Sequence, residues 1–141
     1  MRASVKRFLI YWLPVMLYCL AIFVQSSFPS QVRAPGIPMA DKILHAAGYA
    51  LLAALVFRAA AATRPEAPIG RTWIWSVLFA SIYGALDEFH QSFVPSRSAD
   101  AADILADAAG ALLGAGICRW IAPRTVGFPK KTQIDNPPKF L

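Results

Sequence analysis

The stretch "DEFHQSFVPSRSADAADILAD", from Asp87 to Asp107, places five carboxylates, one histidine and one arginine in a chain that is otherwise strongly apolar. Carboxylates and imidazoles transfer protons and bind divalent metal ions. The planar guanidinium of Arg97 is suited to hold a phosphate or a carboxylate through two parallel hydrogen bonds. A second polar stretch, "DKILHAAGY", adds Lys42 and His45. Both stretches therefore carry the residue types of a binding or catalytic site.

The composition indicates the surroundings of these polar residues. Of the 141 residues, 57% are hydrophobic and only 16% are charged, whereas soluble domains carry roughly 25% charged residues. The formal net charge of +6 comes from basic residues scattered between apolar runs. They do not form a basic stripe with interleaved aromatic residues, so we expect a lipid bilayer and no nucleic acid as the partner. Cys19 and Cys118 each lie within an apolar run, and we assign them neither a disulfide nor a metal.

Four apolar segments are each close to the length of about 20 residues that crosses a hydrocarbon core. They cover about 8–25, 43–62, 73–91 and 103–121. We therefore predict an all-α fold, an integral membrane four-helix bundle formed by residues 1–122. Residues 123–141 are rich in proline and lysine and are predicted to form a disordered cytoplasmic tail.

The distribution of lysine and arginine predicts the orientation, because such residues accumulate in cytoplasmic loops. Eleven fall on one side of the predicted bundle and three on the other. The first set is Arg2, Lys6, Arg7, Arg58, Arg64, Arg71, Arg119, Arg124, Lys130, Lys131 and Lys139; the second is Arg33, Lys42 and Arg97. We predict that both termini are cytoplasmic and that the two polar stretches lie together on the extracytoplasmic side.

The short uncharged runs of the third and fourth segments predict where the acids lie. The uncharged run of the third segment, from Trp73 to Leu86, has only 14 residues. At about 1.5 Å per residue these span about 21 Å. The fourth segment has 15 such residues, 108–122, which span about 22 Å. The acids of both segments should therefore lie within or just beneath the outer boundary of the bilayer. Since acids facing lipid are costly, we expect them to face one another around a cavity open to the outside.

Helical spacing gives each predicted helix one polar side. These sides consist of Tyr83, Asp87, His90 and Gln91 on the third helix, Asp100, Asp103 and Asp107 on the fourth, and His45 and Tyr49 on the second. We expect one cluster that joins these three helices, with the first helix peripheral to it. Small residues at every fourth position, Ala106, Gly110 and Gly114, predict close approach of the fourth helix to a neighbour. A helix N-cap is expected near Ser98 or Asp100.

The two polar stretches together resemble the VanZ-like family of small bacterial membrane proteins related to the teicoplanin resistance protein VanZ. The resemblance covers about residues 25–116. It rests on Lys42, His45, Tyr49, Asp87, Glu88, His90, Gln91, Phe93, Pro95, Arg97, Asp103 and Gly110. Two positions depart from the family pattern: Ser96 stands where glycine is usual in the turn, and Asp107 where asparagine is common. The resemblance implies a multi-pass protein of the bacterial inner membrane with a role in the cell envelope or in glycopeptide resistance.

Three interpretations of the polar residues stay open. In the first, they pair internally and hold the helices together, with Arg97 forked onto a carboxylate. In the second, they bind a divalent metal, for which the candidate ligands are His45, Asp87, His90 and Asp103, and Glu88 offers a further carboxylate. In the third, they carry out acid–base catalysis, for which the candidates are His90, Glu88, Asp87 and His45. Contacts with an anionic ligand would come from Arg97, Lys42, Tyr49, Gln91, Asp103 and Asp107.

Two classes of function follow. The first is an envelope factor that binds or modifies a lipid-linked or otherwise anionic envelope molecule in an extracytoplasmic polar pocket. The second is a small proton-linked transporter, in which Asp103 and Asp107 would carry protons; the nearly complete lack of polar residues in the cytoplasmic halves of the spans argues against it. A structural membrane assembly partner without catalysis is the remaining alternative.

Overall fold

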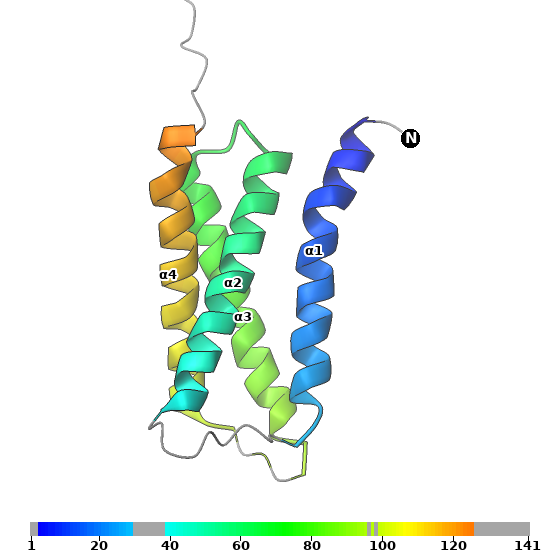
Figure 1. The fold of residues 1–141 in the computed structure, drawn as a ribbon, viewed down its shortest axis with the longest axis vertical. Helices are drawn as coiled ribbons and strands as arrows, with labels where there is room; N and C mark the ends of the chain where they lie inside the picture. Colours follow the sequence, from blue (N-terminus) through cyan, green and yellow to red (C-terminus); the bar gives the residue numbers. More distant parts are fainter. Residues whose placement is uncertain (1–2, 30–38, 96, 98, 126–141) are drawn as a thin grey trace, which may run out of the picture.

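A computed structural model describes residues 3–29, 39–95, 97 and 99–125 of the chain (Figure 1). Its four helices are α1 (Ala3–Ser26), α2 (Ala40–Thr63), α3 (Ile69–Gln91) and α4 (Ala101–Thr125). The described part contains no strand, so the predicted all-α four-helix fold is confirmed. Each helix covers its predicted apolar segment and extends beyond it by a few residues. α4 continues past residue 122 to Thr125, and the rest of the predicted tail lies outside the described residues.

The surface of the bundle is apolar, as expected for a protein surrounded by lipid. Large side chains such as Leu105 and Leu113 are 71% and 64% exposed. Within the described residues, α1, α2 and α4 are each long and apolar enough to cross a membrane. α3 has 23 residues, but Arg71 near its start and Asp87 and Glu88 near its end shorten its uncharged run. The chain is therefore a helical membrane protein.

The helices run alternately up and down, which brings the two polar stretches to one end (Figure 1). The starts of α2 and α4 lie at this end together with the ends of α1 and α3. The helices α2, α3 and α4 pack on one another, whereas α1 packs on α2 and α3 and does not contact α4 in the described part of the chain. We call the end where α3 ends and α4 begins the polar end.

Two glycines set the close packing of α4 on α2. A Cβ atom on Gly110 would collide with the backbone carbonyl of Ala46, and one on Gly114 with that of Ala50. The predicted close approach of α4 to a neighbour is thus confirmed at these two positions, and the neighbour is α2. Because Ala46 directly follows His45 and Gly110 lies one turn after Asp107, this contact fixes the polar residues of α2 against those of α4.

The attachment of α1 uses side-chain hydrogen bonds as well as packing. The Tyr83 hydroxyl donates to the carbonyl of Cys19 at 2.7 Å, and the Tyr18 hydroxyl donates to that of Gly48 at 3.2 Å. Near the other end, Nε1 of Trp12 donates to Oγ1 of Thr63 at 3.3 Å. These bonds connect α1 to both α2 and α3 along its length.

Candidate functional site

Lys42 lies at the centre of a group of carboxylates. Its Nζ is 2.6 Å from Oδ2 of Asp100, 2.6 Å from Oδ1 of Asp103 and 3.3 Å from Oδ2 of Asp41. An ammonium group has three hydrogens to donate, so these three acids engage it fully. Lys42 therefore connects the start of α2 to the start of α4 and has little capacity left for a further anion.

Asp100 also caps α4. Its Oδ1 accepts the backbone N–H of Ala102 at 2.9 Å, and the helix begins at Ala101. The N-cap expected near Ser98 or Asp100 is thus found at Asp100. Two hydrogen bonds hold the pKa of Asp100 below its ordinary value: the one from Lys42 contributes most, and the one from the Ala102 N–H contributes less. Asp100 therefore carries its negative charge throughout the neutral range.

The deeper part of this group is formed by one residue from each of three helices. Nδ1 of His45 on α2 is 3.0 Å from Oδ1 of Asp107 on α4 and 4.0 Å from Oε1 of Glu88 on α3. Oε2 of Glu88 accepts the backbone N–H of Asp100 at 3.1 Å. The side chains of Glu88 and Asp107 are both only 1% exposed. In each of them one oxygen, Oε1 of Glu88 and Oδ2 of Asp107, has no hydrogen-bond partner among the described residues.

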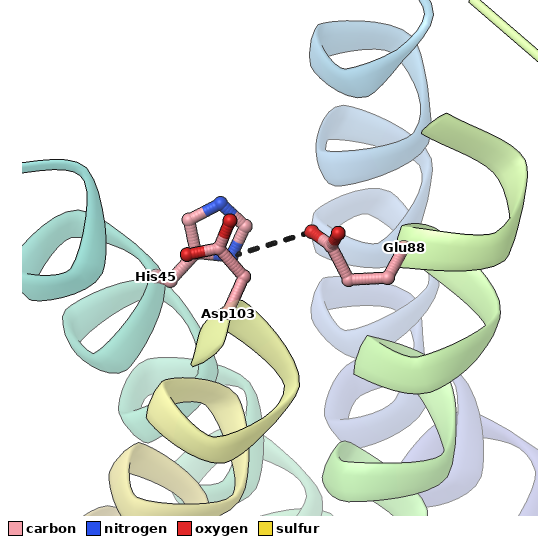
Figure 2. Close-up of side chains that lie close together, drawn as sticks. All are labelled: His45, Glu88 and Asp103. Carbon is pink, nitrogen blue, oxygen red and sulfur yellow. Dashed lines mark ion pairs between the residues drawn. The ribbon is translucent and has the colours of Figure 1, made fainter. Parts of the chain in front are cut away.

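Three potential metal ligands meet in this deeper part. Figure 2 shows His45, Glu88 and Asp103 converging from α2, α3 and α4. One ligand atom of each lies within 4.8 Å of those of the other two. We name the whole group the carboxylate cluster; its members are Lys42, His45, Glu88, Asp100, Asp103 and Asp107. Of the predicted candidates, the structure brings together His45, Asp103 and the further carboxylate of Glu88, and it leaves Asp87 and His90 outside this trio.

Asp87, the neighbour of Glu88, belongs to a different group. Its Oδ1 accepts the hydroxyl of Ser26 on α1 at 2.5 Å, and its Oδ2 accepts Nε2 of Gln91 at 2.9 Å. Oε1 of Gln91 in turn accepts Nη1 of Arg97 at 2.7 Å. Asp87 and Gln91 are both buried. A continuous chain of hydrogen bonds therefore runs from α1 through α3 to the loop before α4.

Arg97 is held by neutral acceptors. In addition to the bond from Nη1 to Gln91, Nε of Arg97 donates to the carbonyl of Phe28 at 3.0 Å. Nη2 of Arg97 donates to the carbonyl of Gln25 at 3.4 Å. It forms no ion pair with a described carboxylate, so the interpretation in which Arg97 forks onto an acid is wrong. Of the five N–H donors of a guanidinium, two have no acceptor within the described part of the chain. Its positive charge is thus available to an incoming anion.

His90 and Tyr49 have surroundings unlike those of His45. Nε2 of His90 is 3.1 Å from Oγ of Ser27, and its ring lies 4.6 Å from that of Phe23, centroid to centroid. His90 therefore contacts α1. Tyr49 is 3% exposed in the apolar core, one turn below His45, and its hydroxyl has no well-formed hydrogen bond in the described residues.

The structure corrects the expectation of a single cluster with α1 at its periphery. Tyr83, Asp87, His90 and Gln91 do share one side of α3, as predicted, but that side faces α1. Neighbouring residues on a helix point about 100° apart, so Glu88 faces α2 and α4 instead. We call the second group the α1–α3 network; its members are Ser26, Ser27, Asp87, His90, Gln91 and Arg97. Sequence reasoning missed the two serines, although Ser26 and Ser27 directly follow the first predicted span.

A groove on the described part of the molecule is lined by none of these polar groups. It has a volume of about 850 Å³ and lies between α1, α2 and α3. Its walls are mainly apolar, with Trp12, Trp75 and Phe79 among them, and Arg64 and Arg71 line it near the loop from α2 to α3. Such a groove suits lipid chains, and the polar chemistry of the molecule lies elsewhere.

Comparison with known proteins identifies the type of chain. A family model described as VanZ/LLP1 matches residues 4–122. This range includes all four helices up to Ala122 and every residue of both polar groups. Neither a curated protein nor a solved structure matches the chain significantly.

Proposed function

Because the chain belongs to the VanZ/LLP1 family, we propose that it is a cell-envelope factor whose polar end binds or modifies a lipid-linked or otherwise anionic envelope molecule. The observation that carries this proposal is the state of Arg97. Its guanidinium is held in place by Gln91 and two backbone carbonyls, yet no described acid neutralises it. A fixed, uncompensated arginine with donors to spare suits a phosphate or a carboxylate.

The roles proposed for the other residues follow from their contacts. Lys42 is already engaged by three acids, so it positions Asp100 and Asp103 and is a weaker candidate than Arg97 for ligand binding. Glu88 has a buried oxygen without a donor, which makes it the best-placed acid either to accept a proton or to ligate a metal. His45, held by Asp107 at 3.0 Å, would exchange protons beside it.

We propose further that the polar end faces the extracytoplasmic side of the bacterial inner membrane. The eleven-to-three distribution of basic residues supports this orientation. Reporter fusions after Arg64 should be active only as cytoplasmic reporters, and a fusion after Ser96 only as an external one. The reverse pattern would place the polar end in the cytoplasm and remove access to external envelope molecules.

The proposal is tested with Arg97→Lys in a strain whose glycopeptide resistance or envelope phenotype depends on the protein. Lysine keeps the positive charge but loses the planar fork. Loss of one charge-assisted hydrogen bond is worth about 1.5–3 kcal/mol, which corresponds to a drop in ligand affinity of roughly tenfold or more. The phenotype should be lost while the protein accumulates normally, and mass spectrometry should show less co-purifying anionic lipid.

Arg64→Lys is the matched control, because Arg64 lies at the opposite end beside the apolar groove. It should leave both the phenotype and the co-purifying lipid unchanged. A fully active Arg97→Lys protein that accumulates at the normal level would contradict the proposal and favour a structural role for the polar end.

A further inference from the structure

We propose that His45, Glu88 and Asp103 form a binding site for one divalent cation of the zinc or manganese type. The three residues come from three different helices, and one ligand atom of each lies within 4.8 Å of the others (Figure 2). Ligand atoms around a tetrahedral zinc ion are about 3.4 Å apart, given bonds of about 2.0–2.2 Å. Small side-chain rotations would therefore close this group around an ion without moving a helix.

The buried oxygen of Glu88 is the independent observation that points to a ligand. Oε1 has no hydrogen-bond partner in the described residues, its side chain is 1% exposed, and it faces Nδ1 of His45 at 4.0 Å. Leaving a buried carboxylate oxygen without a partner is costly. The other oxygen of Glu88 is held by the N–H of Asp100 at 3.1 Å, so Oε1 stays directed toward the space beside His45. A cation there would supply the missing partner.

The charge of the carboxylate cluster favours a cation. Its four acids, Glu88, Asp100, Asp103 and Asp107, meet one ammonium group, that of Lys42; with neutral His45 the formal sum is −4 + 1 = −3. Arg97 does not reduce this excess, because its partners are Gln91 and backbone carbonyls. Lys42 engages Oδ1 of Asp103, which leaves the second oxygen of Asp103 for a metal. A divalent ion would bring the sum to −1.

The donor set selects the class of cation. One imidazole nitrogen with two carboxylates suits zinc or manganese, whereas calcium and magnesium prefer oxygen ligands only. Nδ1 of His45, the nitrogen that faces Glu88, also lies 3.0 Å from Oδ1 of Asp107; a cation bound at Nδ1 would replace that hydrogen bond and have Asp107 as a further neighbouring carboxylate. Three protein ligands leave at least one position for water or a phosphate oxygen. Binding of the cation is independent of the proposed envelope ligand, but its role toward that ligand rests on the proposed function.

The test uses the untagged full chain in detergent, freed of metal with a chelator and then titrated with Zn²⁺ or Mn²⁺. Calorimetry should show one equivalent bound, and the melting temperature should rise; Mg²⁺ and Ca²⁺ should bind at least tenfold more weakly. Glu88→Gln keeps the shape of the side chain but removes the ligating carboxylate, so it should weaken zinc affinity at least tenfold. Asp103→Asn should do the same and serves as the second variant if Glu88→Gln does not fold.

Asp41→Asn is the control for charge, because Asp41 lies beside Lys42 at the exposed rim and outside the trio. It should keep the zinc affinity within about twofold of the original. The inference is overturned if the original protein binds no zinc or manganese, or if Asp41→Asn weakens binding as much as Glu88→Gln. Because no envelope molecule is present in this experiment, such a result would leave the proposal for Arg97 standing.

Discussion

Asp87 and Glu88 are adjacent in the chain and both are buried, yet they illustrate two opposite ways of placing an acid inside this bundle. Both oxygens of Asp87 accept hydrogen bonds, from Ser26 and from Gln91. Glu88 has one oxygen that accepts a backbone N–H and one that accepts no hydrogen bond from the described residues. The α1–α3 network thus satisfies its acid internally, while the carboxylate cluster leaves its acid unsatisfied. The first arrangement holds helices together, and the second is suited to bind something.

The two groups also differ in how their helices are joined. The carboxylate cluster sits above the backbone contact between α2 and α4, which leaves no room for a Cβ atom at Gly110 or Gly114. The α1–α3 network joins a helix that makes no contact with α4 in the described residues and that depends on side-chain hydrogen bonds. A rigid pair of helices therefore presents the unsatisfied acids, and a more loosely attached helix carries the contacts that fix Arg97.

The largest effect is expected where the rigid pair is disturbed. Gly110→Ala places a methyl group against the carbonyl of Ala46, so α2 and α4 must move apart. Overpacking typically costs about 1–3 kcal/mol, and here we expect about 3 kcal/mol or more because the obstacle is backbone. The change should also separate Lys42 and His45 from the acids of α4. The change is measured as the free energy of unfolding in a mixed detergent titration.

Gly116→Ala is the matched control on the same helix, because a Cβ atom at Gly116 meets nothing within 4 Å. It should leave the free energy of unfolding unchanged or raise it slightly, since alanine favours helix more than glycine does. Equal losses in the two variants would mean that the α2–α4 contact does not set the stability of the polar end.

A smaller effect is expected in the α1–α3 network. Ser26→Ala removes the donor to Oδ1 of Asp87 and leaves that buried oxygen without a partner, which costs about 1–3 kcal/mol. Because the α2–α4 contact stays intact, zinc binding should persist while α1 loosens, detected as faster proteolysis near the end of α1. Ser92→Ala is the control, since the Ser92 hydroxyl is exposed and donates only to the carbonyl of Phe89. A Ser26→Ala protein as stable as the Ser92→Ala protein would show that Asp87 does not attach α1.

The sequence was sufficient for the helices and for the sides on which their polar residues lie. Apolar runs of about 20 residues are a strong signal, and every predicted span lies within an observed helix. The glycine spacing correctly indicated close approach of α4 to a neighbour. The polar side formed by Tyr83, Asp87, His90 and Gln91 was also correct, because helical geometry fixes which residues share a side.

The spacing of polar residues could not predict which helix packs against each polar side. The helical period of 3.6 residues determines which side chains share one side of a helix, but it does not determine which other helix covers that side. Asp87 and His90 were expected to face the second and fourth helices, whereas the structure places Ser26 and Ser27 of α1 against them. Glu88 stands outside the polar side of α3, and that position is what directs it to His45 and Asp103.

The smallest effect is expected at the exposed edge of the carboxylate cluster, where Asp100 is 48% exposed. Its pKa is lowered in the folded protein, mainly by the hydrogen bond from Lys42, so its charge stabilises the fold at neutral pH. That stabilisation is lost as the pH falls below the ordinary value of about 3.9 and through the lower value of the folded state. Asp100→Asn keeps a side-chain oxygen to cap α4 but removes the charge. It should therefore lower the melting temperature slightly at pH 7. The fall of the melting temperature between about pH 4 and pH 2 should be smaller in this variant than in the original protein. An equally large fall would mean that the buried acids, and not Asp100, make the fold sensitive to acid.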